Sequence, residues 1–395
     1  GLVKPDLLDP YNPNVLKGDR PIFEDYFVVI SAISDSTFEP RSFPQPIGFT
    51  SSRRAGRNDQ FGDIDQILFN QNLILSASLI KGDTAFKPPD YELRLSPVFN
   101  INYVDAPDLQ ILYADPRRGT TRQDGHIGLQ EGFLDYHLRN VSDRFDFDSV
   151  RFGVQPFSTD FRGFLFQDSQ LGVRLFGNRE NNLWQYNLAW FRLMEKDTNS
   201  GLNDAAGPLR ENDIFAFNLY RQDLPVLGLT SQFTVVHNRN RETDIFFDKN
   251  GFQQRPAVIG DQRRREYDVT YLGANIDGHV GRLNLTGSFY YALGTDHRSQ
   301  FTGKEQDINA WFAALEPSID FDWVRFRLSA VYASGDSDPY DGSANGFDSI
   351  FDNPLIAGAD TSYWIRQAIP FIGGGGVQLT GRNSLLPNLR SSKEQ

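Results

Sequence analysis

Three successive runs of alternating apolar and polar residues, between Leu129 and Gly177, constrain the fold more than any other part of the sequence. The apolar members are Leu134, Tyr136 and Leu138, then Val150, Phe152 and Val154, then Leu171, Val173 and Leu175. A period of two puts these side chains on one face of a β-strand and the intervening charges on the other. Charges on the inner face of a soluble sheet would strongly destabilise the fold. In a membrane barrel, by contrast, the inner face lines a watery lumen and the apolar face meets lipid. The pattern therefore predicts transmembrane β-strands.

Composition narrows the classes of protein further. The chain has 395 residues, no cysteine and a net charge of −12, and its mean hydropathy is −0.45. No run approaches the roughly 18 apolar residues of a membrane helix, while a barrel strand needs only about ten residues with every other one apolar. Nucleic acid is not expected as a partner, because phosphate binding needs a basic face. The absence of cysteine fits an exported bacterial protein.

Thirteen strand-like runs follow one another along the chain. They lie near 25–41, 66–82, 91–104, 127–139, 148–156, 169–177, 183–194, 213–221, 229–238, 266–277, 282–293, 307–318 and 324–334. The connections between them alternate in length, from long ones such as 42–65 and 105–126 to short ones such as 140–147 and 278–281. An up-and-down outer-membrane barrel has this alternation, with short periplasmic turns and long extracellular loops. A soluble sandwich has no reason to keep it.

The expected fold is all-β, a transmembrane up-and-down antiparallel β-barrel of about 16–18 strands when complete. Residues 1–24 are rich in proline and aspartate and are expected to form a periplasmic arm, and 25–395 the barrel. No signal peptide is visible, so an exported chain would begin after its cleavage site. Bacterial barrels have an even number of strands. A fourteenth strand over Tyr363–Ile372 is an option, and the polar tail predicts that the carboxy-terminal strands are missing, with a separate tail after a smaller barrel as the alternative.

Several of these segments resemble a known family. The succession LQEGFLDYHL, VRFGVQPF and QLGVRLFG, with YASGDSDPYDGSANGFDSIF much later, resembles the alginate-export-like outer-membrane barrels of bacteria. The matching positions are Glu131, Arg151, Gln155, Gly172, Arg174, Gly335, Asp336, Asp338, Asp341 and Asp348. The resemblance implies a porin-like fold and a conduit for acidic sugars or similar solutes. Because that group is functionally mixed, it does not establish alginate as the solute.

The predicted lumen face is rich in arginine. The candidate residues of an anion pathway are Arg94, Glu131, Asp135, Arg139, Arg151, Arg174, Arg282, Arg325 and Arg327. Rings of arginine make a pore favour anions, because the guanidinium is always charged and binds carboxylates in a bidentate way. The alternative is a ladder in which the arginines pair with inward acids and only stiffen the wall. The two interpretations are compatible.

A phenylalanine-rich excursion interrupts the strands between Pro156 and Gln170. Its candidate constriction residues are Phe157, Asp160, Phe161, Arg162, Phe164, Phe166 and Asp168. A loop this apolar should not lie open to water, so we expect it to fold against the lumen wall or an adjoining loop. Inside the lumen it would narrow the path. The alternative is a packed cap without selectivity.

Two loops offer other chemistry. Asp336, Asp338 and Asp341 lie in a glycine-containing loop, and clustered oxygens of this kind suit calcium. Their spacing is not that of an EF-hand, so a solvated acidic loop is the competing interpretation, and no other cofactor is expected. Arg263, Arg264 and Arg265 could recruit anionic solutes or contact lipopolysaccharide, with a solvated loop as the default. No metal-ligand spacing of histidines and no G-x-S-x-G elbow supports an enzyme.

Together these features predict a porin-like channel in the bacterial outer membrane. Anionic solutes such as acidic sugars and organic acids would pass through an arginine-lined lumen. The expected partners are outer-membrane lipid, lipopolysaccharide and the solute. The competing hypothesis is a barrel that serves as a sleeve or anchor for a lipoprotein or a surface assembly.

Overall fold

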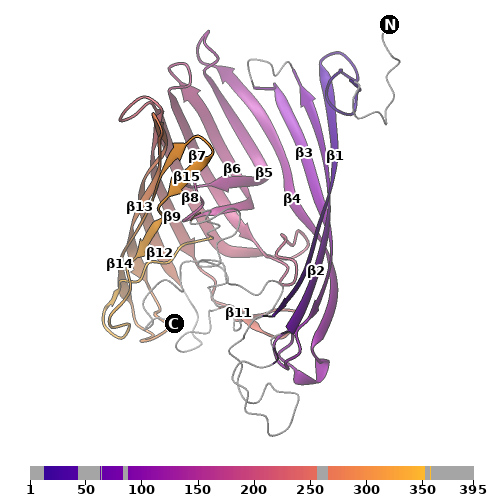
Figure 1. Cartoon of the computed structure of the whole chain (residues 1–395), viewed down its shortest axis with the longest axis vertical. Coiled ribbons are helices and arrows are strands. Elements are labelled where there is room, and N and C mark those ends of the chain that lie inside the picture. Colours follow the sequence, from indigo (N-terminus) through magenta and orange to yellow (C-terminus); the bar gives the residue numbers. More distant parts are fainter. Residues whose placement is uncertain are drawn as a thin grey trace.

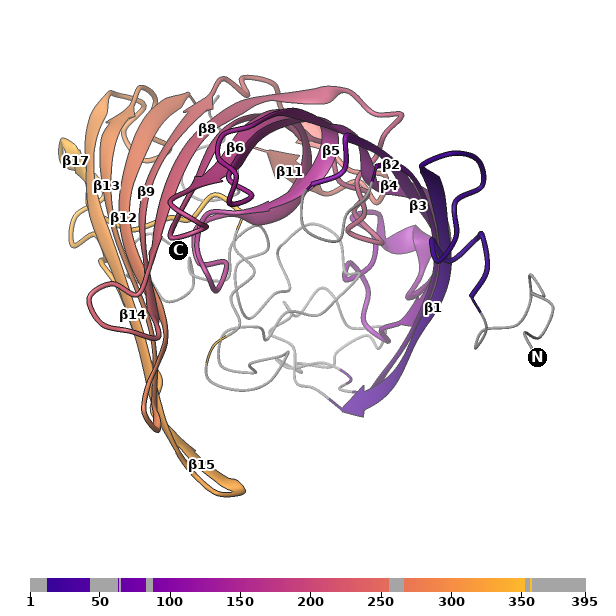
Figure 2. The same cartoon turned by 90° about the horizontal axis from the view of Figure 1, so that it is seen from above.

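The computed structural model describes residues 13–42, 63, 65–82, 88–255, 266–351 and 356. The long strands form one antiparallel sheet, in the order β1-β2-β3-β4-β5-β6-β7-β8-β9-β12-β13-β14-β15, so that each long strand pairs with its neighbours along the chain (Figure 1). Strands β10 and β11 form a separate pair, and the short β17 joins β14 in parallel. Figure 2 shows this sheet curving into an arc with β1 and β14 toward its two edges. The predicted all-β, up-and-down antiparallel topology is confirmed, although the sheet formed by the described residues is not closed.

The strands have the following bounds. They are β1 Tyr26–Ser42, β2 Asp65–Lys81, β3 Tyr91–Asp105, β4 Thr121–Asn140, β5 Phe147–Ser158, β6 Gln167–Arg179, β7 Trp184–Met194, β8 Leu209–Gln222, β9 Leu229–Asn240, β10 Phe246–Phe247, β11 Gln253–Arg255, β12 Tyr267–Val280, β13 Leu283–Asp296, β14 Gln306–Phe321, β15 Val324–Arg327, β16 Ala330–Ala333 and β17 Ser343–Ala344. A 3-10 turn, Pro116–Arg118, lies in the β3–β4 loop.

All thirteen predicted runs coincide with strands, because a period of two is a strong local signal. The largest differences are at β4, which begins at Thr121, and at the last run, which is divided into β15 and β16. The small β10–β11 hairpin and β17 were not predicted, since two or three residues carry no periodicity. The option of a strand over Tyr363–Ile372 lies outside the described residues.

The short connections are built from residues that accept a left-handed backbone. In the β6–β7 turn Glu180, Asn181 and Asn182 all have positive φ, and Gly281 (φ 60°) and Asp322 (φ 55°) occupy the β12–β13 and β14–β15 turns. Such conformations suit glycine, asparagine and aspartate. These tight turns fix the register of neighbouring strands, so the inward and outward faces continue from strand to strand.

Burial across the wall is inverted relative to a soluble protein. On β3 the side chain of Ile101 is 55% exposed, whereas the neighbouring Asn102 is completely buried and donates to Asn100 Oδ1 at 2.8 Å. The same alternation recurs on the other long strands, with leucine, phenylalanine, tyrosine and tryptophan outside and amides and charges inside. An apolar surface of this extent is stable only against an apolar partner such as lipid.

The apolar outer face has a sharp limit at the end of the long loops. Arg192, Asp213, Arg239 and Asp268 stand in one register row across β7, β8, β9 and β12. On β13 the outward apolar residues run from Leu283 to Leu293, just short of this charged row. About ten residues at ~3.3 Å each, tilted by ~40°, span about 25 Å, which is the height of the lipid-facing band of outer-membrane barrels.

Placing an arginine within this band should destabilise the protein. Phe233 faces outward on β9, in the register row of Phe289, so Phe233→Arg is expected to lower the free energy of unfolding in lipid vesicles by about 2–4 kcal/mol. The matched control is Phe247→Arg, which changes another exposed phenylalanine, in the β10–β11 hairpin. Equal effects in a denaturant titration of both variants would contradict a lipid-facing band.

Candidate functional site

Three arginines occupy the inner face of the sheet between β3 and β6. Arg94 lies on β3, Arg151 on β5 and Arg174 on β6, and the last two are directly opposite each other in the β5–β6 register. Arg94 pairs with Glu92 at 2.7 Å and with Glu131 at 3.3 Å. Arg151 pairs with Asp135, opposite it on β4, at 2.6 Å. These contacts neutralise the first two arginines within the wall.

Arg174 is different. Its Nε donates to Asn187 Oδ1 at 2.7 Å. Within the part of the chain that the structure describes, no carboxylate lies within ion-pair distance of its guanidinium. Arg174 is therefore a lumen cation whose charge is not cancelled by an adjoining acid.

Aromatic rings separate the three guanidinium groups. The ring of Phe133 lies 5.4 Å from Arg94 Cζ and 4.2 Å from Arg151 Cζ. The ring of Phe176 lies 5.6 Å from Arg151 Cζ and 4.6 Å from Arg174 Cζ. Cation–π contacts of this kind attract each guanidinium to the neighbouring rings. The sequence analysis did not identify either phenylalanine. Phe133 is two residues from Asp135 and Phe176 is two residues from Arg174, so the alternation along each strand places both rings on the inner face.

The remaining predicted pathway arginines do not join this group. Arg139 is largely exposed at the end of β4 and pairs with Asp148 at 2.8 Å. Arg282 lies in the exposed β12–β13 turn, and Arg325 pairs with Asp320 on the β14–β15 hairpin at 2.5 Å. Arg327 lies 3.6 Å from Glu316. The predicted set of pathway residues is thus divided. The alternation along a strand shows which face a residue lies on, but it does not show how high along the wall the residue stands.

The phenylalanine-rich segment between β5 and β6 folds inward around one carboxylate. Asp160 is 4% exposed, and its oxygens accept hydrogen bonds from the backbone N–H groups of Gly163 (2.6 Å), Phe164 (3.1 Å) and Leu165 (3.2 Å). The Tyr290 hydroxyl, on β13, donates to the same carboxylate at 2.8 Å. Asp160 therefore shapes the loop and ties it to the opposite wall.

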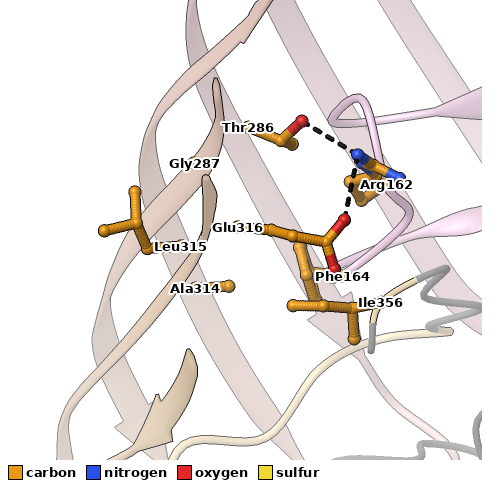
Figure 3. A pocket seen from close by; sticks show the side chains of 8 residues that line it. All are labelled: Arg162, Phe164, Thr286, Gly287, Ala314, Leu315, Glu316 and Ile356. Atoms are coloured by element: carbon orange, nitrogen blue, oxygen red, sulfur yellow. Dashed lines mark hydrogen bonds and ion pairs between the residues drawn. The ribbon is translucent and has the colours of Figure 1, made fainter. Parts of the chain in front are cut away.

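Arg162 makes a second contact between the β5–β6 segment and strands β13 and β14. Its guanidinium donates to Thr286 Oγ1 at 2.9 Å and to Glu316 Oε1 at 3.4 Å (Figure 3). Phe164 and Ile356 pack beside this contact without leaving space for a solvent molecule. Asp160 and Arg162 were predicted as charges that line a constriction; the structure places both in contacts that attach the loop to β13 and β14.

The loop joins a second inward segment to make a plug. We call residues 159–166 together with 347–351 the lumen plug. Backbone hydrogen bonds connect the two parts, from Ile350 N to Leu165 O (3.0 Å) and from Gln167 N to Phe351 O (2.8 Å). The plug packs on an aromatic core inside β7–β14, where Phe164 lies 5.0 Å from Phe312 and Phe166 lies 6.0 Å from Phe191.

Small residues on the wall make room for this plug. Ala292, Ala310 and Ala314 are buried on the inner faces of β13 and β14 beside the phenylalanines. A Cβ added to Gly273 on β12 would lie 2.5 Å from the Tyr290 ring, so this position has no space for a side chain. The inner wall of β7–β14 is therefore shaped for its own plug, as the predicted packing of the excursion against the lumen wall requires.

An open cavity of about 450 Å³ adjoins Arg174 and the plug. Its lining residues are Gln130, Pro156, Phe157, Ser158, Gln167, Asp168, Ser169, Arg174, Asn187 and Tyr220. Asp168 is neutralised by Lys196 at 2.8 Å, and Phe161 packs edge-on against Tyr220 with ring centroids 5.8 Å apart. The lining thus combines one uncancelled positive charge with amides and hydroxyls, which suits a hydrated anion.

The three carboxylates predicted as a calcium site are not brought together. Asp336 accepts from Asp338 N at 2.9 Å, Asp338 from Tyr340 N at 3.2 Å, and Asp341 from Ser343 N at 2.7 Å. Their oxygens close local turns, and among the described residues no group of three acidic or histidine side chains could hold a metal ion. Arg263, Arg264 and Arg265 lie outside the described residues.

Fold and site together define an up-and-down β-wall with an apolar outside, a polar inside and an inward plug. No helix of the described residues is long and apolar enough to cross a membrane. The chain is similar to OccK7 (OpdD) of Pseudomonas aeruginosa, with 13% identity over 80% of this chain and 72% of that chain and a TM-score of 0.44. It is also similar to OprB of Pseudomonas putida, with 14% identity over 78% and 76% of the two chains and a TM-score of 0.39.

No protein-family model matches the chain, and no curated protein matches it. The resemblance to alginate-export-like barrels therefore stays a prediction.

Removing the charge of Asp160 should loosen the plug. Asp160→Asn keeps the size of the side chain but replaces one acceptor oxygen with a donor, leaving buried N–H groups without a partner, at about 1–3 kcal/mol each. We expect a loss of at least ~2 kcal/mol in a denaturant titration, and a smaller loss for Tyr290→Phe, which removes one donor. Asp143→Asn, in the exposed β4–β5 turn, is the control; an Asp160 variant that matched it would refute the anchoring role.

Proposed function

We propose that the chain is the wall of a bacterial outer-membrane channel through which anionic solutes pass passively. The inverted burial supports a membrane location, because an apolar outer band about 25 Å high needs lipid around it. The alternation of long loops with tight turns supports an outer-membrane barrel in particular. Lipid and lipopolysaccharide are then the partners of the outer face.

Arg174 carries the proposal of anion preference. It presents a permanent positive charge to the cavity, while Arg94 and Arg151 are paired with acids. A solute carboxylate could form the two parallel hydrogen bonds that no protein carboxylate forms there. Around it, Gln130, Gln167 and Ser158 offer groups for hydroxylated solutes such as acidic sugars or other organic acids.

The lumen plug favours a channel over a sleeve for another protein. Residues 159–166 and 347–351 already occupy the inner side of β7–β14 with the chain's own aromatic core. A sleeve would need that volume for its partner. A channel needs only a path beside the plug, where the Arg174 cavity lies.

Neutralising Arg174 should weaken anion preference. In planar bilayers under a salt gradient, the anion-to-cation permeability ratio of Arg174→Gln should fall by about fivefold, because one charge at ~4 Å in water contributes about 1 kcal/mol. Arg282→Gln removes the same charge from an exposed turn and should leave the ratio nearly unchanged. Equal reversal potentials for Arg174→Gln and the unaltered protein would contradict the assignment of Arg174 as the selectivity charge.

A further inference from the structure

A small hairpin inside the β9–β12 connection has a preorganised tip. Strands β10 and β11 flank Asp248–Gly251, which we call the hairpin tip. Asp248 Oδ1 accepts from the backbone N–H groups of Asn250 and Phe252, both at 2.9 Å, and Gly251 takes φ +87°. The carboxylate fixes the turn, so Lys249 and Asn250 project in defined directions.

The hairpin tip contacts parts of the chain that are remote in the sheet. Lys249 Nζ forms ion pairs with Asp124, on the inner face of β4, and with Asp197, in the β7–β8 loop, the latter at 2.6 Å. Asn250 Nδ2 donates to Asn199 Oδ1 at 2.7 Å, and both amides are 2% exposed. Between β4 and β9 lie β5, β6, β7 and β8, so the hairpin reaches over four strands.

The other long loops meet at the same place. The Ala114 N–H, in the β3–β4 loop, donates to Asn250 O at 3.0 Å, and Arg118 donates to Lys249 O at 3.1 Å. In the β7–β8 loop, Asn203 Nδ2 donates to Leu129 O of β4 at 3.2 Å and to Ser169 O of β6 at 2.7 Å. Three loops therefore meet one another and contact β4 and β6. Figure 1 shows β11 at this end of the wall, opposite the short turns.

The charges at the tip suit a reversible contact. Burial lowers the pKa of Lys249, but the hydrogen bonds and charges of Asp124 and Asp197 outweigh it and raise that pKa overall, so the ammonium stays charged. The Lys249 side chain is nevertheless 41% exposed. Its partners Asp124 and Asp197 are 23% and 6% exposed, so water and salt reach these ion pairs from the Lys249 side. Screening there weakens the attraction and lets the contacts break and re-form.

We propose that the hairpin tip is a latch that holds the long-loop end of the lumen closed, with Lys249 as its releasable contact. The inference rests on the proposed channel function. In the latched state the tip, the β3–β4 loop and the β7–β8 loop block access to the lumen above the plug. When Lys249 leaves Asp124 and Asp197, the hairpin swings away with β10 and β11, and the path to the Arg174 cavity opens.

The first test removes the Lys249 charge in the full chain, in planar bilayers. Lys249→Gln should raise the open probability roughly two- to fivefold, and Lys249→Arg, which keeps the charge, should restore closure. Lys304→Gln is the matched control, since it removes an exposed positive charge from the β13–β14 loop. Equal gating of Lys249→Gln and Lys304→Gln would overturn the latch while leaving the channel intact.

The second test fixes the latch covalently, which guards against a variant that merely folds poorly. The chain has no cysteine, so Asn199→Cys with Asn250→Cys provides one reactive pair. Oxidation of the two adjoining thiols to a disulfide, confirmed by the loss of free thiol, should abolish most current, and a reductant should restore it. Current unchanged by cross-linking would refute the latch. If the unaltered protein and every variant, cross-linked or reduced, carry no current, the channel itself fails, and the latch fails with it.

Discussion

The apolar outer face of the sheet is the constraint on which the rest of the structure depends. Lipid cannot hydrogen-bond to a peptide group, so every strand must satisfy its backbone through its neighbours. The continuous register from β1 to β14 does this for the strands between β2 and β13, while β1, at the edge of the described sheet, pairs with β2 on one side. With the apolar side chains outside, amides and charges must turn inward. The polar lumen, and any selectivity within it, follows from that inversion.

Inside the wall, buried carboxylates organise the polar groups. Asp160 binds backbone N–H groups and Tyr290, and Asp248 does the same on a smaller scale in the hairpin tip. Each one converts an irregular segment into a defined shape, because leaving buried N–H groups unpaired is costly. Arg174 is the exception: it keeps a charge that the protein does not cancel, and it does so beside a cavity.

The strands of the wall could be predicted from the sequence because the period of two is a local pattern. Leu134 and Asp135 are adjacent in the sequence and therefore lie on opposite faces of β4, whichever strand pairs with it. What lies inside the wall could not. The pairing of Asp160 with Tyr290 joins residues 130 apart, and Lys249 meets Asp124 through loops without periodicity. The heights of Arg282 and Arg325 along the wall depend on where the turns fall. The alternation of residues along a strand does not show this, so the sequence analysis placed both residues in one group with Arg174.

The most direct test of this account measures which side chains of β13 touch lipid. Because the chain has no cysteine, spin labels can be placed singly at Phe289, Tyr290, Tyr291 and Ala292 in reconstituted vesicles. The account predicts strict alternation: labels at Phe289 and Tyr291 should collide with oxygen dissolved in lipid, and labels at Tyr290 and Ala292 should be shielded from it. Uniform oxygen accessibility, or preferential collision of all four labels with a water-soluble nickel chelate, would contradict a lipid-facing sheet.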